Sequence, residues 1–311
     1  MNSPSVLNYE IRPCKYAERK MLLVSLARII SGFKQLYQYV GFGGLSFTDF
    51  KLFHKELYIN SMFSIEGGDF SQARLNMNNP YSCIKIMQGM STDMLQGIDL
   101  TRPSIIWLDY DDVLSMCVFK DINIIFNSIL PGSLYLMSCN RQLRNEEKKQ
   151  PLKPNELRDL FGDIVPFEAE ENCCADSNVS ETIRAMIMNS CNKIIESRNK
   201  LGENIKFLPL YNIKYEENRG ARMYTFGGIL LPTDFDESSL NIDDLEFVKT
   251  DKPYEIIIPN LTYRETMYIN QILGDNAKEA EAIKNGIINE EDLILFKKTY
   301  KFMPNFYDVR L

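Results

Sequence analysis

Three glycines and one carboxylate have the spacing of a site for a nucleotide-like ligand. Gly41, Gly43 and Gly44 follow the short apolar run 37–40, and Glu66 ends the next apolar run, 23 residues after Gly43. Glycines in a strand-to-helix turn remove side chains where a ligand must approach the backbone. An acid about 20 residues farther along accepts hydrogen bonds from ribose hydroxyls in a Rossmann-type half-site. These residues therefore predict a ligand that carries a ribose.

A cluster of carboxylates follows the strongest predicted strand. The run 103–108, PSIIWL, is typical of a strand buried on both faces of a parallel sheet, and three acids follow it within four residues. Carboxylates at the carboxyl end of such a strand lie at the ligand-binding edge. Asp109 and Asp111 could take a proton, orient an acceptor hydroxyl or hold a divalent cation such as Mg²⁺. The alternative is a turn that caps the next helix, which explains one acid but not three.

Composition favours some classes of partner over others. The chain has 311 residues, a net charge of −7 and ordinary apolar and charged fractions. An acidic chain has no broad electrostatic grip on DNA or RNA, so a small-molecule or protein acceptor is favoured over nucleic acid. No apolar run approaches the length of a membrane span, and residues 1–20 contain no apolar signal core, which predicts a cytoplasmic protein.

Histidine and cysteine give little support for a metal or disulfide site. The seven cysteines are scattered without a C-x-x-C pair, and the single histidine is His54, so a structural zinc site is not expected. His54 lies on the predicted helix after the glycine turn. A lone histidine there is more often a packed or surface side chain than a base.

The predicted elements alternate between strands and helices and then change pattern. Five strand-like runs precede a hairpin around residues 217–220; they lie at 37–40, 60–65, 81–87, 103–108 and 133–137. The polar segment 67–80 is expected to be irregular. We predict a main domain over 1–232, an acidic linker over 233–255 and a helical appendage over 256–311, in which Thr262 and Glu265 form a capping box.

The glycine turn and the order of the elements resemble those of class I S-adenosylmethionine-dependent methyltransferases. In V-G-F-G-G, Gly41 and Gly43 match the two glycines of the family's E/D-x-G-x-G loop, whereas Tyr39 takes the position of the usual acid. Five strands followed by a hairpin also match the family's sheet. The resemblance covers roughly residues 9–232. The R-P-C-K start and the C-terminal tail are similar to those of a bacterial family of O-methyltransferases.

This resemblance implies an α/β fold and a set of site residues. The fold would be a Rossmann-like doubly wound sheet with a terminal antiparallel hairpin, followed by a small helical appendage. The implied activity is methyl transfer from S-adenosylmethionine to oxygen, with Asp109 and Asp111 as the catalytic candidates. The implied cofactor contacts are Gly41, Phe42, Gly43, Gly44, Glu66 and Asp93. Asp93 would meet the adenine; the alternative is that residues 91–93 cap a helix.

The resemblance leaves three alternatives open. The first turns of the first predicted helix carry Arg12, Lys15, Arg19 and Lys20, with Glu18 among them. They form either a solvated face, which we favour, or a basic collar over the cofactor site. Tyr39, the missing N/D-P-P-Y motif and the helical tail allow a catalytically inactive subunit whose C-terminal helices bind a partner. A nucleic-acid base methyltransferase is a third alternative, weakened by the missing proline after Asp109 and by the acidic charge.

Overall fold

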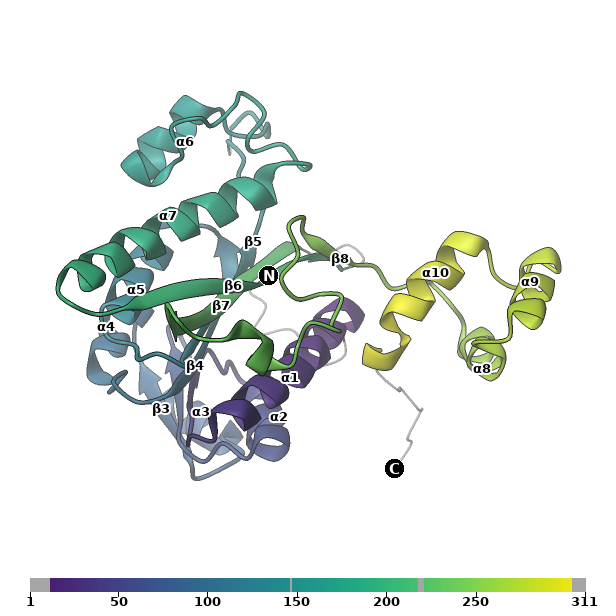
Figure 1. Ribbon diagram of the computed structural model, residues 1–311, viewed down its shortest axis with the longest axis horizontal. Coiled ribbons are helices and arrows are strands. Elements are labelled where there is room, and N and C mark those ends of the chain that lie inside the picture. Colours follow the sequence, from purple (N-terminus) through teal and green to yellow (C-terminus); the bar gives the residue numbers. More distant parts are fainter. Residues whose placement is uncertain (1–11, 146, 218–220, 304–311) are drawn as a thin grey trace.

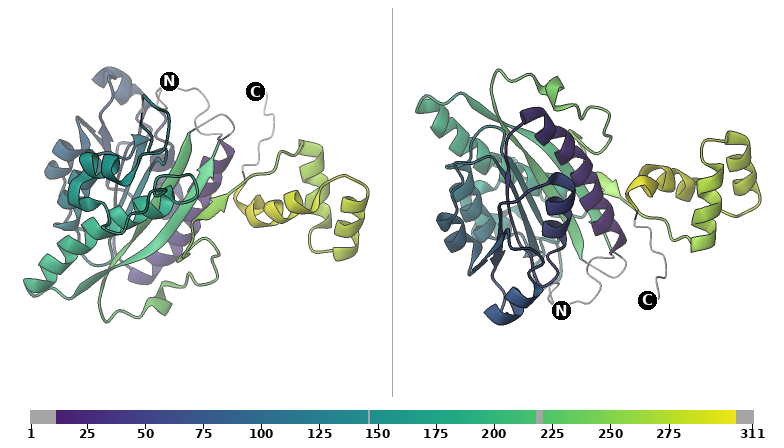
Figure 2. Two further views of the ribbon diagram at one scale, coloured as in Figure 1. Left: turned by 90° about the horizontal axis from the view of Figure 1, so that it is seen from above. Right: turned by 90° about the horizontal axis from the view of Figure 1, so that it is seen from below.

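The protein is built around one mixed β-sheet with helices on both faces (Figures 1 and 2). The computed structural model describes residues 12–145, 147–217 and 221–303. The strand order is β3-β2-β1-β4-β5-β7-β6-β8. The strands are β1 (Gln38–Gly41), β2 (Met62–Glu66), β3 (Ile84–Gln88), β4 (Ser104–Val113), β5 (Leu134–Asn140), β6 (Ile205–Glu216), β7 (Arg222–Pro232) and β8 (Tyr254–Ile256).

The sheet has the topology that the sequence predicts. Strands β1 to β5 are mutually parallel, and β7 is antiparallel to both β5 and β6. The doubly wound sheet with a terminal antiparallel hairpin is therefore confirmed. The turn predicted at 217–220 lies, apart from Glu217, outside the described residues. Strand β8, which pairs in parallel with β6 at the edge, was not predicted.

Helices cover the sheet as two layers. One face carries α1 (Pro13–Phe33) and α2 (Thr48–Leu57). The other carries α4 (Ser91–Met94), the 3₁₀ turn η3 (Leu95–Gly97), α5 (Met116–Phe126), α6 (Pro154–Phe161), η4 (Gly162–Ile164) and α7 (Val179–Lys200). Figure 2 shows α1 and α7 on opposite sides of the sheet.

Strand β4 explains why both faces are apolar. Its side chains alternate, so Ile105 and Trp107 join the core under α1, whereas Ile106 and Leu108 join the core under α5 and α7. All four are buried. A continuous apolar run is what a strand buried on both faces requires, and the strand expected at 103–108 is therefore central.

The asparagine-rich segment 67–80 is not irregular throughout, contrary to expectation. Helix α3 (Gln72–Asn78) begins after Ser71, whose side chain accepts a hydrogen bond from the Arg74 backbone N–H. Leu75 anchors this helix with a fully buried side chain. A single cap and a single apolar anchor stabilise a helix too short to show a periodic pattern.

Beyond β7 the chain remains in contact with the sheet before it reaches the C-terminal helices. Segment 233–255 contains the 3₁₀ turn η5 (Glu237–Leu240), and its residues Leu240, Ile242 and Phe247 are buried in the core under α1. The helices α8 (Tyr263–Ile272), α9 (Asn276–Lys284) and α10 (Glu290–Thr299) form a small apolar cluster of their own. They project from the main body in Figure 1. The predicted capping box opens α8.

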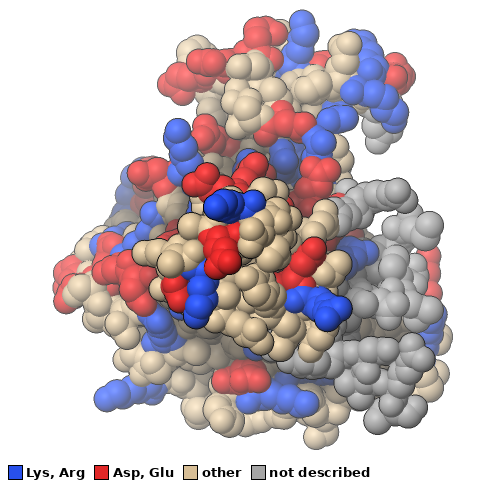
Figure 3. Space-filling model, turned by 90° about the vertical axis from the view of Figure 1, so that its right-hand side faces the viewer, with Lys and Arg blue, Asp and Glu red and all other residues tan. Residues whose placement is uncertain are grey.

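The final described turn, η6 (Tyr300–Phe302), returns to the main body. The Phe302 ring packs edge-on against Phe247, with ring centroids 5.6 Å apart. Figure 3 shows the side of the molecule from which α8–α10 project, where Lys and Arg alternate with Asp and Glu among uncharged residues. Within the ranges that the structure describes, no helix is long and apolar enough to cross a membrane.

Candidate functional site

The glycine turn and Glu66 meet at the carboxyl edge of the sheet. Strands β1 and β2 are parallel, with Gly41 opposite Ser64, so the turn after β1 lies beside the end of β2. Glu66 Oε1 accepts hydrogen bonds from the Gly43 backbone N–H at 3.0 Å and from Ser64 Oγ at 2.5 Å. The structure thus brings together the glycines and the acid that the sequence singles out. It adds Ser64, which lies in the middle of an apolar run and carries no motif.

Glu66 is a buried carboxylate with a perturbed affinity for protons. Burial raises its pKa from 4.5 to about 7, and the hydrogen bonds from Ser64, Gly43 and Gly44 oppose that shift. Near neutral pH the carboxylate is therefore close to its midpoint. A ligand whose hydroxyls donate to Glu66 would stabilise the ionised form.

The close approach of Glu66 requires glycine at position 43. An added Cβ would lie 2.4 Å from Ser64 Oγ and 2.9 Å from Glu66 Oε1. The neighbouring Gly44 has a φ of 57°, in the left-handed region that glycine adopts without strain. Position 43 therefore has no room for a side chain.

Gly43→Ala should lower the free energy of unfolding by about 1–3 kcal/mol, because the new methyl group must displace buried Ser64 or Glu66. Urea denaturation measures this loss. Gly32→Ala is the matched control: its Cβ would meet only the Ser239 carbonyl oxygen at an ordinary 3.6 Å. Equal stability of the two variants would mean that the turn opens freely in solution.

A chain of contacts that starts at Phe42 joins the glycine turn to α4 and α5. Its ring packs edge-on against Tyr110, with centroids 5.2 Å apart. The Tyr110 hydroxyl donates to Asp121 at 2.7 Å, and Asp121 also accepts from Ser91 and Thr92 at 2.5 and 2.7 Å. Asp121 is fully buried. One carboxylate therefore fixes β4, α4 and α5 relative to Phe42.

Asp93 follows Ser91 and Thr92 in α4, and its side chain is exposed. The alternative that residues 91–93 cap the helix is wrong. The N-cap is Met90, which makes no side-chain cap bond, and Ser91 and Thr92 donate to Asp121 instead. Asp93 is free to face a ligand from the turn after β3.

The acids after residue 108 lie within the strand itself. Strand β4 continues to Val113, and α5 is preceded by Ser115, so the turn-and-cap alternative is also wrong. Asp109 is largely buried and its Oδ2 lies 2.8 Å from Lys15 Nζ, whereas Asp111 is exposed. The register between β4 and β5 shifts between Asp109 and Val113, so the strand is irregular where Asp111 lies.

Helix α1 covers this edge of the sheet with buried charges. Lys15 and Arg19 are only 3% and 2% exposed, so the expectation of a solvated face is wrong for both. Lys15 pairs with Asp109 and with Glu18, while Arg19 Nε donates to Asp49 Oδ1 at 2.5 Å. These partners come from β4 and α2, and spacing along α1 cannot reveal them.

Glu18 extends the network into the antiparallel hairpin. It is fully buried and accepts hydrogen bonds from the hydroxyls of Thr225 on β7 and Tyr215 on β6. Thr225 also contacts Ser138 on β5, whose hydroxyl accepts a hydrogen bond from the Trp107 indole N–H. The network therefore ties α1 to four strands. The solvated face expected for Glu18 is therefore also wrong, since an acid among basic residues on a helix gives no sign of partners on distant strands.

Tyr39 occupies the position where the methyltransferase loop has an acid. Its ring is buried against Phe50 and Phe53 of α2. Burial raises the pKa of the Tyr39 hydroxyl well above its usual range, and the charges of Asp49 and Asp109 raise it further. The phenol is therefore neutral and does not replace the charge of the missing acid.

His54 lies outside this constellation. Its Nδ1 is 2.9 Å from the Ile59 carbonyl oxygen, and its ring packs on Tyr81. Over the described part of the chain, no three His, Cys, Asp or Glu side chains are grouped so that they could hold a metal ion. The expectation of Mg²⁺ at the aspartates therefore has no support.

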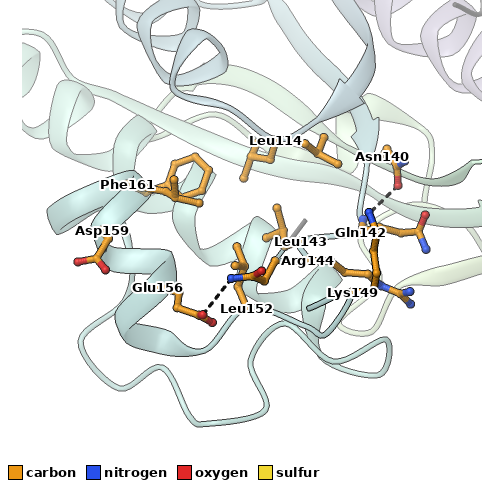
Figure 4. Close-up of a pocket in the computed structure, with 13 residues that line it drawn as sticks. Leu114, Asn140, Gln142, Leu143, Arg144, Lys149, Leu152, Glu156, Asp159 and Phe161 are labelled. Carbon is orange, nitrogen blue, oxygen red and sulfur yellow. Dashed lines mark hydrogen bonds between the residues drawn. The ribbon is translucent and has the colours of Figure 1, made fainter. Parts of the chain in front are cut away.

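A pocket of about 670 Å³ opens past the carboxyl ends of β4 and β5 (Figure 4). Its walls come from those strand ends, from the segment 142–152 and from α6. This segment folds back and buries Leu143 and Leu152. The lining residues are Val113, Leu114, Asn140, Gln142, Leu143, Arg144, Asn145, Lys149, Leu152, Glu156, Asp159, Leu160 and Phe161.

Several solved structures share parts of this fold at low similarity. A putative hemolysin from Lactococcus lactis is 10% identical, with a TM-score of 0.40 over 68% of this chain and 86% of that chain. The O-methyltransferase TomG from Streptomyces achromogenes, solved with SAM, is 12% identical, with a TM-score of 0.35 over 66% and 78%. An O-methyltransferase from Bacillus cereus, solved with SAH, is 11% identical, with a TM-score of 0.36 over 70% and 82%.

Similarity this low does not indicate what the present chain binds, and no curated relative matches it. The family model described as Putative O-methyltransferase, in contrast, matches residues 7–311. The match includes the glycine turn, Glu66, the aspartates of β4 and the C-terminal helices. The chain belongs to the family described as Putative O-methyltransferase.

Proposed function

We propose that the protein binds S-adenosylmethionine and transfers its methyl group to an oxygen atom of an acceptor. The observation that carries this proposal is the buried Glu66 carboxylate, held 3.0 Å from the Gly43 N–H at the end of β2. A carboxylate beside a glycine turn is suited to the two hydroxyls of a ribose. Membership in the O-methyltransferase family supports the choice of cofactor and reaction.

The residues around Glu66 fit the remaining parts of the cofactor. Gly41, Gly43 and Gly44 carry no side chain that would keep the backbone away from it. Phe42 and the exposed Asp93 flank the turn after β3, where the adenine would lie. When bound, the cofactor supplies a methyl group on a positively charged sulfur.

Asp109 and Asp111 are assigned to the acceptor side of the site. Methyl transfer is an in-line displacement, so the protein must chiefly hold the acceptor oxygen close to and in line with the methyl carbon. Asp109 is oriented by Lys15, and Asp111 lies exposed two residues farther along β4. We assign a small-molecule or protein acceptor, not nucleic acid. Mg²⁺ has no part in the proposal. Cytoplasmic location, bacterial origin and the domain boundaries stay predictions.

A catalytically inactive subunit is the second candidate function. Two observations favour it: the neutral Tyr39 at the acid position, and the pairing of Asp109 with Lys15, which occupies one of the two catalytic candidates. The C-terminal helices also expose Tyr263 and Ile294, which a protein partner could cover. Cofactor binding without turnover, with any acceptor, would favour this candidate.

Glu66→Ala tests the cofactor site. We expect its affinity for S-adenosylmethionine to fall by about 1–3 kcal/mol, because two hydrogen bonds from ribose to a carboxylate are lost. Isothermal titration calorimetry measures the change. Glu56→Ala, at an exposed acid on α2, is the control and should bind like the unsubstituted protein. Unchanged affinity in Glu66→Ala would remove Glu66 from the site.

A further inference from the structure

We propose that the pocket past β4 and β5 binds a monocarboxylic acid with an apolar body and that the carboxylate is the methyl acceptor. This inference rests on the proposed function and names its substrate class. The pocket volume, about 670 Å³, is within the usual range of small-molecule sites. Val113, the last residue of β4, pairs with Asn140 at its rim, two residues beyond Asp111. The pocket therefore opens at the end of the strand that carries Asp109 and Asp111.

One side of the pocket is suited to an anion. Figure 4 shows Asn140, Gln142 and Lys149 on this side. The exposed Lys149 ammonium forms no ion pair with the described residues. The contact of Arg144 with Asp176 is long, with 4.0 Å between Nη2 and Oδ2. Arg141 and Arg222 also contact the Asp176 carboxylate. Because three arginines share Asp176, Arg144 can turn toward a bound carboxylate at little cost.

The rest of the pocket is apolar. Leu114, Leu143, Leu152 and Phe161 are buried side chains that converge beneath α6 (Figure 4). They form a surface that can desolvate an aliphatic or aromatic body. A ligand with its carboxylate toward the strand ends and its apolar body under α6 would satisfy both sides.

The two acids that line the pocket do not oppose this arrangement. Glu156 caps α6 by accepting from the Lys153 N–H at 2.9 Å, and it also accepts from Asn145 at 3.2 Å. Asp159 lies on α6, on the side opposite Lys149 in Figure 4. A ligand bound in the reverse direction would instead need a positively charged group on the α6 side, next to these acids.

A carboxylate acceptor also fits the state of Asp109. An alcohol must lose its proton during transfer, yet Asp109, the buried candidate base, is ion-paired with Lys15. A carboxylate is already ionised at neutral pH and needs no base. One of its oxygens attacks the methyl carbon while the carbon–sulfur bond breaks and leaves its electron pair on sulfur. A methyl ester and a neutral thioether result, and no proton moves.

Two titrations separate this inference from the proposed function. The protein is titrated with 4-phenylbutyrate alone and, separately, with S-adenosylmethionine alone. We expect 4-phenylbutyrate to bind at least tenfold more tightly than the neutral 4-phenylbutanol. The double variant Arg144→Gln/Lys149→Gln should lose about tenfold in affinity for the acid, as expected when charge-assisted hydrogen bonds are lost, and keep its affinity for S-adenosylmethionine.

Lys148→Gln is the matched control. Lys148 lies next to Lys149, but it faces Glu156 and does not line the pocket. Its substitution should leave both titrations unchanged. Equal binding of acid and alcohol, or full affinity for the acid in the double variant, would overturn the assignment of ligand class, whatever the result with S-adenosylmethionine.

The methyl-transfer step has its own readout. With methyl-labelled S-adenosylmethionine and a series of acids (hexanoate, decanoate and 4-phenylbutyrate), we expect a labelled product that mild alkali converts to labelled methanol, as an ester requires. Transfer to the alcohol, giving an alkali-stable ether, would overturn the ester step. So would the absence of any label transfer to the acids by protein that binds both the cofactor and the acid.

Discussion

Asp49→Asn is expected to lower the free energy of unfolding by about 3–5 kcal/mol, because it removes the negative charge that pairs with the buried Arg19 guanidinium. Arg19 is 2% exposed, and its Nε donates to Asp49 Oδ1 at 2.5 Å. Asparagine has the shape of aspartate and retains an acceptor oxygen, so the change removes only the charge. The pair joins α1 to the first turn of α2, directly after the glycine turn.

Urea denaturation measures this effect, and two comparisons isolate it. Asp244→Asn breaks the solvent-exposed pair of Asp244 with Arg28 and should leave stability unchanged. The double variant Arg19→Met/Asp49→Asn should recover much of the loss, since it removes the buried positive charge as well. An Asp49→Asn variant as stable as Asp244→Asn would mean that water reaches Arg19 in solution.

Glu66→Gln should have opposite effects on stability and on cofactor binding. The pKa of Glu66 is raised from 4.5 to about 7 by burial, so the folded state holds the proton more tightly than the unfolded state. The free energy of unfolding therefore falls as pH rises from about 4.5 to 7, and ionised Glu66 costs about 3 kcal/mol above that range. Glutamine retains the two hydrogen bonds without the charge. We expect the variant to be more stable at pH 8 and unchanged at pH 4.

The affinity of the unsubstituted protein for S-adenosylmethionine should rise about tenfold between pH 6 and pH 8, as Glu66 ionises and can accept from both ribose hydroxyls. Titration calorimetry at the two pH values measures this change. The same titrations on Glu66→Gln correct for ionisation of the cofactor itself. A variant that shows the full pH dependence would contradict the assignment of Glu66 to the ribose.

Local patterns were sufficient to predict the sheet and the first part of the site. Glycine turns and apolar runs are short-range signals, so the positions of Gly43, Glu66 and β4 could be predicted without knowledge of the tertiary contacts. The order of the strands followed from the resemblance to a known fold. Strand β8 has only three residues and no pattern of its own, and it forms because β6 offers a free edge.

Charged residues with distant partners could not be predicted in the same way. In the sequence, Lys15 and Arg19 are typical of a solvated helix face. In the structure, β4 and α2 bring Asp109 and Asp49 next to them. Asp121 belongs to no sequence motif. The three hydroxyl groups that donate to it come from α4 and β4, which are distant in the sequence. The pocket depends on the return of segment 142–152 over Leu143 and Leu152. In each case the tertiary contact, and not local propensity, determines the role.

The most direct test of the central claim is titration calorimetry of the folded protein with S-adenosylmethionine and, in parallel, S-adenosylhomocysteine. The proposed function predicts that both bind at a single site, with the micromolar affinity that a preformed ribose carboxylate and glycine turn can support. Failure of both to bind to protein with an intact cooperative unfolding transition would contradict the claim. It would leave the inactive subunit as the better account of this chain.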